Sequence, residues 1–198
     1  MNLVLSGPSG AGKTTIFNNL RVYSNNFTKS VSYTTRKMRD NEVNGKDYCF
    51  VSKKIFLKLV KNNFFFEIAE YADNFYGIPN SNISTTVDDK DVFFDLIPSS
   101  GLNLKNHYNN TCLVYILPPD IDELNIRRGD RGNNRLDYDL RELQIAKNYD
   151  YLIVNESVDK STQQLIDIID VYKKNSISSN CQFLDGYAAS KHRVRVRW

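Results

Sequence analysis

Residues 7 to 14 read Gly7-Pro8-Ser9-Gly10-Ala11-Gly12-Lys13-Thr14, and this stretch decides the fold of the chain. It is the complete pattern G-x-x-x-x-G-K-[ST] of a phosphate-binding loop, and it stands between the apolar run Leu3-Val4-Leu5 and a helix-like stretch from Thr15 to Tyr23. The glycines let consecutive backbone N–H groups turn toward phosphate oxygens, the lysine charge reaches the β and γ phosphates, and the final hydroxyl can ligate Mg²⁺. We therefore predict that residues 7 to 15 bind a nucleoside triphosphate, with Thr14 as the metal ligand.

Length and composition are those of one α/β domain. The chain has 198 residues, of which 41% are hydrophobic and 12% aromatic, enough for a full core but not for several large domains. Its apolar runs are far too short to span a bilayer, and no secretory signal precedes the phosphate loop. Cys49, Cys112 and Cys181 are widely separated and fit reduced thiols, so we expect a soluble, cytoplasmic protein. A net charge of +3 is too small to indicate nucleic-acid binding by itself.

Strand-like and helix-like segments alternate along the chain, as a doubly wound parallel sheet requires. Almost continuously apolar segments, typical of strands covered on both faces, occupy residues 3–6, 92–97, 111–117 and 151–154. Apolar spacing or capping signals predict helices at 120–128, from Leu136 to Leu143, and at 165–172 behind a capping box that begins at Ser161.

Residues 30–80 interrupt this alternation. They contain short polar, β-rich stretches and one amphipathic segment from Ser52 to Asn62, in which Ile55, Phe56, Leu59 and Val60 share a face. We predict one domain over residues 1–175 with an inserted lobe at 30–80. Residues 176–198, which end in alternating basic and apolar side chains, are expected to form a solvated basic tail.

The inserted lobe carries a second long motif, Val31-Ser32-Tyr33-Thr34-Thr35-Arg36-Lys37-Met38-Arg39-Asp40-Asn41-Glu42-Val43-Asn44-Gly45-Lys46-Asp47-Tyr48-Cys49-Phe50-Val51. It resembles the guanylate kinase family at every fixed point of V-S-x-T-T-R-x-x-R-x-x-E-x-x-G-x-x-Y-x-F-V. Three later segments, Asn74-Phe75-Tyr76-Gly77, Leu117-Pro118-Pro119 and Tyr151-Leu152-Ile153-Val154-Asn155, occur in the family's order, so the resemblance covers about residues 1 to 173. It implies a P-loop kinase fold that transfers the γ-phosphate of ATP to GMP with Mg²⁺. Neither a membrane nor a nucleic acid is an expected partner, and a monomer and a homodimer both stay open.

A second phosphate site follows from residue types. Guanidinium forks and hydroxyl donors match a phosphate dianion, and the motif and its continuation supply five such groups: Ser32, Arg36, Arg39, Tyr48 and Tyr76. The resemblance implies that these groups bind the phosphate of GMP and that Glu67 faces its guanine. A carboxylate can accept both the N1–H and the 2-amino group of guanine, which adenine cannot offer. Asp95, at the end of a buried strand, resembles the family's acidic residue near the metal and the GMP site.

Phosphoryl transfer depends on positioning and charge neutralisation more than on covalent chemistry. We assign Lys13 to the β and γ phosphates, and Arg36 to the transferred group. The resemblance adds two further catalytic arginines, Arg131 and Arg135, at the end of a lid that we place at residues 125–135. The tip of this lid consists of Asn133 and Asn134 alone, so it is shorter than the lid of the family.

Two apolar residues stand where the family presents polar groups to guanine. Ile78 replaces a serine or threonine, and Ile97 replaces a second acidic residue. We therefore predict relaxed base selectivity.

Other functions fit parts of the pattern. One alternative is a kinase for a different nucleoside monophosphate, and another is a catalytically weak binding module that uses the inserted lobe to hold phosphorylated peptides. The intact phosphate loop favours the kinase over the module. A GTPase switch is not supported, because no N-K-x-D motif occurs in the chain.

Overall fold

The computed structural model describes residues 1–24, 26–71, 73–83, 90–128 and 143–178. Its centre is a five-stranded sheet in the order β2-β7-β1-β8-β9. The strands are β1 (Asn2–Ser6), β2 (Phe27–Lys29), β7 (Asp91–Asp95), β8 (Thr111–Leu117) and β9 (Tyr151–Val154), and every pair in this sheet is parallel. The α/β fold with a parallel sheet is thus confirmed. Strand β2 was not predicted, because three residues with two polar side chains carry almost no apolar signal.

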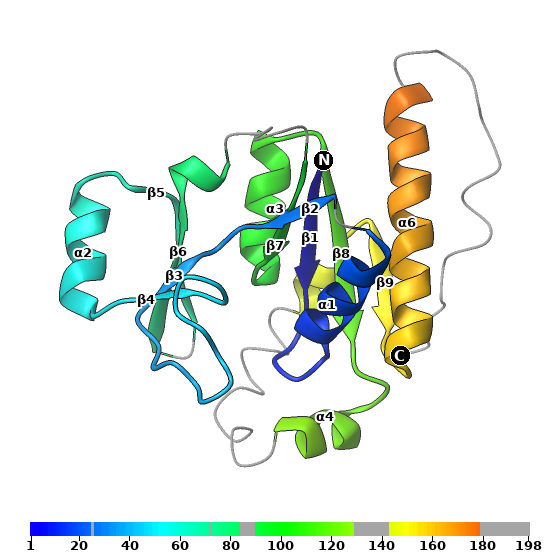
Figure 1. Cartoon of the computed structure of the whole chain (residues 1–198), viewed down its shortest axis with the longest axis horizontal. Coiled ribbons are helices and arrows are strands. Elements are labelled where there is room, and N and C mark those ends of the chain that lie inside the picture. The colour runs from blue at the N-terminus through cyan, green and yellow to red at the C-terminus, as the bar shows by residue number, and fades with distance from the viewer. Residues whose placement is uncertain (25, 72, 84–89, 129–142, 179–198) are drawn as a thin grey trace.

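Helices cover both faces of this sheet, α6 to its right and α3 to its left in the view of Figure 1. Helix α1 (Lys13–Tyr23) packs against α6 (Val158–Ser178), and α3 (Pro98–His107) packs against β8 and β1. Alternation along β1 divides the core: Leu3 and Leu5 join the buried group under α1 and α6, whereas Val4 joins the group under α3. Both groups are buried, and the phosphate loop begins between them at the carboxyl end of β1.

The second sheet forms a separate body at the left of Figure 1, in the order β4-β3-β6-β5. It consists of β3 (Tyr33–Thr34), β4 (Cys49–Phe50), β5 (Phe65–Tyr71) and β6 (Asn74–Pro79), followed by a 3₁₀ turn, η1 (Asn80–Asn82). Helix α2 (Lys53–Lys61) buries Phe56 completely, and this ring stacks on Phe65 and Phe75 with centroid distances of 4.7 and 5.7 Å. The predicted amphipathic segment is therefore a helix that closes the core of this lobe.

Three boundaries differ from the predictions. Helix α6 begins at Val158, so the capping box predicted at Ser161 is wrong: the Ser157 hydroxyl accepts from the Lys160 N–H at 3.3 Å instead. The Ser161 hydroxyl donates to the Asn155 side chain at 3.1 Å. Strand β7 ends at Asp95, two residues early, because Pro98 begins the unpredicted helix α3 with Ile97 as its N-cap. Helix α6 continues to Ser178, three residues beyond the predicted domain end.

Helix α4 (Ile121–Arg128) leads from β8 toward the predicted lid. The two arginines predicted to be catalytic, Arg131 and Arg135, lie outside the described residues, as do the predicted lid tip and the tail from residue 179 onward. No helix in the described ranges is both long enough and apolar enough to cross a membrane.

Candidate active site

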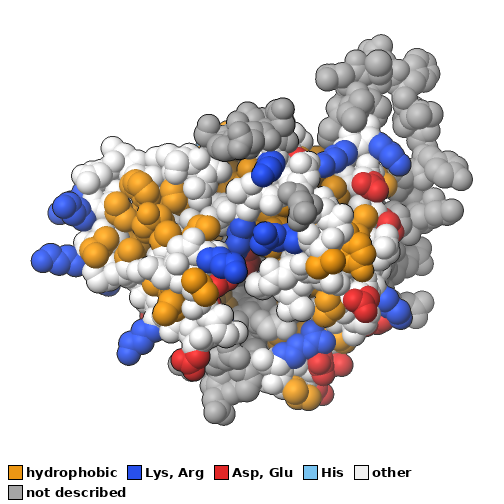
Figure 2. Space-filling view, viewed as in Figure 1, with side chains coloured by type: hydrophobic (Ala, Val, Ile, Leu, Met, Phe, Trp, Pro, Cys, Tyr) orange, Lys and Arg blue, Asp and Glu red, His pale blue; other side chains and the backbone are white. Residues whose placement is uncertain are grey.

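A cleft of about 760 Å³ separates the inserted lobe from the parallel sheet. One wall is the phosphate loop, and the opposite wall is formed by side chains of the lobe, with Asp95 and the start of α3 between them. On the face shown in Figure 2, lysine and arginine side chains gather at the middle of the molecule, between the lobe and the core. The cleft therefore offers positive charge from two sides to one enclosed volume.

The phosphate loop connects β1 to α1, whose first residue is Lys13. The Lys13 ammonium group donates to the backbone carbonyl groups of Gly7 at 2.7 Å and Pro8 at 3.3 Å, and it lies 4.0 Å from the Asp95 carboxylate. The lysine thus lies over its own loop, within the cleft. Every predicted phosphate-loop residue except Ala11 lines the cleft; Ala11 is fully buried beneath it.

Gly12 ends the loop as the N-cap of α1, with φ +97°. A Cβ atom at this position would lie 2.2 Å from Nδ2 of Asn155. That side chain is 2% exposed and is held on both ends, because Nδ2 donates to the Ala11 carbonyl at 2.8 Å and Oδ1 accepts from Ser161. The shape of the phosphate loop therefore depends on an asparagine that follows β9.

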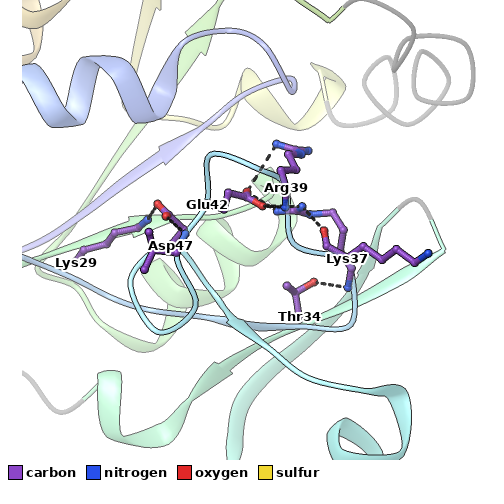
Figure 3. Close-up of polar contacts among 8 residues, drawn as sticks. Lys29, Thr34, Lys37, Arg39, Glu42 and Asp47 are labelled. Atoms are coloured by element: carbon purple, nitrogen blue, oxygen red, sulfur yellow. Dashed lines mark hydrogen bonds and ion pairs between the residues drawn. The ribbon is translucent and has the colours of Figure 1, made fainter.

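The opposite wall is built on a loop between β3 and β4 (Figure 3). The guanidinium group of Arg36 donates to both oxygens of Glu42, at 2.7 and 3.0 Å, and to the Lys37 carbonyl at 2.7 Å. Glu42 also accepts from the Arg39 N–H at 2.9 Å and lies 3.8 Å from the Arg39 guanidinium group. One carboxylate therefore orients both predicted phosphate-binding arginines.

These contacts also shift the ionisation of the pair. Burial lowers the pKa of Arg36, but the hydrogen bond and charge of Glu42 outweigh it and leave that pKa raised. Burial raises the pKa of Glu42, but its hydrogen bonds from Arg36 and the Arg39 N–H leave that pKa below its ordinary value. Both groups are therefore charged at neutral pH.

Aromatic rings support the arginine and line the cleft. The Arg36 guanidinium group lies 5.5 Å from the ring centre of Tyr48 and 5.4 Å from that of Phe50. Tyr48 and Tyr76 meet edge to face at 6.0 Å, and both line the cleft. Burial, together with the negative charge of Asp95, raises the pKa of Tyr48 well above its ordinary value. The hydroxyl of Tyr48 therefore stays protonated and can donate a hydrogen bond to a bound anion.

Two residues predicted to contact GMP do not line the cleft. Ser32 is buried, at 6% exposure, and Glu67 points to α3, where its carboxylate accepts from the Asn103 amide at 3.1 Å. Ile78 is 4% exposed and packs in the core group under α3, whereas Ile97 lines the cleft. Of the two apolar replacements, only Ile97 therefore faces the cleft.

Sequence reasoning assigned no role to several residues that the fold brings to the cleft. Glu42 was a fixed point of the quoted motif, and its spacing from Arg36 and Arg39 was the available signal. Arg127 lies on α4, and its guanidinium group donates to the Glu123 carboxylate, four residues earlier, at 2.8 Å. Asn155 closed a segment quoted for the resemblance but received no role, and Tyr71 carried no signal; only the fold brings these two residues to the cleft.

Comparison with known proteins agrees with this geometry. A sequence profile described as guanylate kinase matches residues 1–172. The guanylate kinase of Lactococcus lactis is 37% identical over 176 residues, covering 85% of this chain and 86% of the relative. That of Nitratidesulfovibrio vulgaris is 39% identical over 194 residues, covering 93% and 92%.

Solved structures give the same answer. The crystal structure of guanylate kinase from Anaplasma phagocytophilum superposes with a TM-score of 0.73 at 29% identity, over 93% of this chain and 96% of the other. Shikimate kinase from Aquifex aeolicus, at 15% identity and a TM-score of 0.50 over 89% of this chain and 99% of the other, shares the fold alone. The predicted P-loop kinase fold is thus confirmed, and the chain belongs to the guanylate kinase family.

Proposed function

We propose that this cleft transfers the γ-phosphate of ATP to GMP, giving ADP and GDP, with the inserted lobe at residues 30–80 as the GMP-binding part of a domain over residues 1–175. One observation carries the proposal: the phosphate loop and the pair Arg36 and Arg39, more than 20 residues apart in sequence, line opposite walls of a single cleft. Two phosphates held by separate sets of donors can then meet in line within one enclosed volume. Membership of the guanylate kinase family supports an ATP-dependent phosphotransferase.

On the ATP side, Lys13 stabilises charge on the β and γ phosphates. Its ammonium group exchanges the carbonyl groups of Gly7 and Pro8 for phosphate oxygens when ATP binds. The Thr14 hydroxyl would hold Mg²⁺, with Asp95 nearby between the two walls of the cleft. An oxygen-only set of this kind fits an ion that takes few protein ligands and keeps its waters and phosphates; when bound, it neutralises charge on the phosphates.

On the GMP side, Arg36, Arg39, Tyr48 and Tyr76 bind the phosphate, and Glu42 keeps the two arginines in place before the nucleotide arrives. Pre-organised donors of this kind act without reorganisation at the moment of transfer. Glu67 reads the N1–H and 2-amino group of guanine, and Ser32, whose side chain is buried, remains a predicted phosphate-binding residue. Arg131 and Arg135 remain the predicted lid arginines that complete charge neutralisation. The free thiols of Cys49 and Cys112 fit action in the cytoplasm.

A coupled assay of ADP formation tests the proposal. ATP is supplied with GMP, AMP, CMP or UMP in turn, and GMP is expected to give the highest kcat/KM. Higher turnover with another monophosphate would establish the alternative substrate, and no turnover with any would favour a binding module.

The variant Lys13→Ala tests the role assigned to Lys13 in phosphoryl transfer. Removing this charge should lower kcat by about 100-fold or more, in line with the loss of one preorganised transition-state donor, with the melting temperature unchanged. Lys54→Ala, on the exposed face of α2, is the control and should behave as the wild type. A folded Lys13→Ala protein with undiminished kcat would refute the assignment.

A further inference from the structure

Glu67 lies on a face of β5 that looks toward the cleft. Along this strand Glu67, Ala69 and Tyr71 share one face, and Tyr71 lines the cleft. Across the antiparallel pair, Glu67 lies opposite Ile78 and Ala69 lies opposite Tyr76, which also lines the cleft. Glu67 therefore lies on the strand face that lines the cleft further along at Tyr71, while its own carboxylate contacts α3 at Asn103.

Helix α3 presents a polar stripe to this strand. Ser99, Asn103 and His107 are four residues apart and so share one face of the helix. The side-chain amide of Asn103 donates to Glu67 Oε2 at 3.1 Å. The backbone carbonyl of Asn103 is hydrogen-bonded to the His107 ring at 2.9 Å. The His107 ring meets Phe66 edge to face at 5.3 Å, next to Glu67. The lobe and the core thus touch through these two neighbouring residues of β5.

The terminal torsion of a glutamate is broad, so a carboxylate without a partner does not hold a fixed plane. Reading both the N1–H and the 2-amino group of guanine requires its two oxygens to lie in the plane of the base. Each carboxylate oxygen has two lone pairs, so Oε2 can accept from Asn103 and from the base at the same time. At the cleft end of α3, Ile97 offers no polar side chain for this purpose.

We infer that Asn103 is a positioning residue for base selectivity: its side-chain amide holds the Glu67 carboxylate in the orientation that reads guanine. The inference rests on the proposed function, because it concerns the GMP site of that reaction. Asn103 acts through Glu67 and contacts neither reacting phosphate. It therefore influences binding of the monophosphate and not of ATP.

The test compares Asn103→Leu, Asn103→Ser and the control Asn106→Leu, an exposed asparagine on the same helix. The KM for GMP should rise about tenfold in both Asn103 variants. This factor corresponds to the lower end of the range for a hydrogen bond to a charged group, because the site is partly exposed. The KM for ATP should stay within twofold, and the ratio of kcat/KM for GMP to that for AMP should fall by a similar factor. Asn106→Leu should match the wild type. Asn103→Ser keeps the test valid if the leucine variant is poorly folded, which its melting temperature would show.

A double-mutant cycle with Glu67→Gln separates positioning from a general structural effect. If Asn103 acts through Glu67, Asn103→Leu in the Glu67→Gln background should change the KM for GMP less than twofold. Equal effects in both backgrounds, or an unchanged KM for GMP in the two Asn103 single variants, would overturn the inference. Failure of the wild type to phosphorylate GMP would instead refute the proposed function, so the two failures are distinguishable.

Discussion

Comparing alanine substitutions at Gly12 and Gly45 shows how much stability depends on a glycine at the end of the phosphate loop. Both have left-handed backbone angles, φ +97° and +79°. They differ in surroundings: a Cβ atom at Gly12 would lie 2.2 Å from the Asn155 amide, whereas nothing lies within 4 Å of one at Gly45. Alanine at Gly45 therefore adds backbone strain alone, and alanine at Gly12 adds strain and a collision.

The expected magnitudes follow from these contacts. Left-handed strain costs an L-residue about 1–2 kcal/mol, so Gly45→Ala should lower the free energy of unfolding by that amount. Gly12→Ala also displaces Asn155 from two buried hydrogen bonds, and leaving such groups unsatisfied costs about 1–3 kcal/mol. We expect Gly12→Ala to be less stable than Gly45→Ala by about 2 kcal/mol, or roughly 4–8 °C in Tm for a chain of this size.

Urea unfolding and calorimetry measure both variants, together with Asn155→Ala and the double variant Gly12→Ala/Asn155→Ala. Because the two residues collide, the double variant should lose less stability than the sum of the single variants. Equal stability of the two alanine variants, or strict additivity in the cycle, would refute the reasoning that Asn155 shapes this loop.

Arg39→Ala should raise the KM for GMP at least tenfold with the KM for ATP within twofold, because charged hydrogen bonds to a phosphate are lost on one wall only; steady-state kinetics against the control Lys37→Ala checks this, and equal damage to ATP binding would contradict it. Ile97→Ser supplies the side-chain cap that α3 lacks and should raise stability by about 0.5–1 kcal/mol, read as a higher Tm; an unchanged or lower Tm would show that the apolar contacts of Ile97 are worth more. Contacts with Arg36 and Arg39 outweigh burial and leave the pKa of Glu42 below its ordinary 4.5, so its contribution to stability is present above that pH and is lost as the pH falls through the lowered pKa. The stability difference between wild type and Glu42→Gln should therefore shrink as the pH falls below about 5, and a difference that does not depend on pH would exclude Glu42 as its source.

The sequence by itself determined those parts of the structure that depend on short, local patterns of residues. The phosphate loop was predicted with its flanking strand and helix because its chemistry depends on residue types at fixed, short spacing. The strands β8 and β9 were predicted residue by residue, since a strand buried on both faces must be continuously apolar. Both arginines of the motif from Val31 to Val51 line the cleft, and their role in binding a phosphate stays a prediction.

Tertiary structure decided the contacts that join distant segments. Asn155 meets the loop 144 residues earlier at Ala11, and Asn103 meets Glu67 across 36 residues. Neither pair has a spacing that a sequence pattern could reveal, because one depends on where β9 ends and the other on how α3 packs against β5. The burial of Ile78, which removes it from the cleft wall, has the same origin: whether a strand residue faces a core or a cleft depends on what packs against that face.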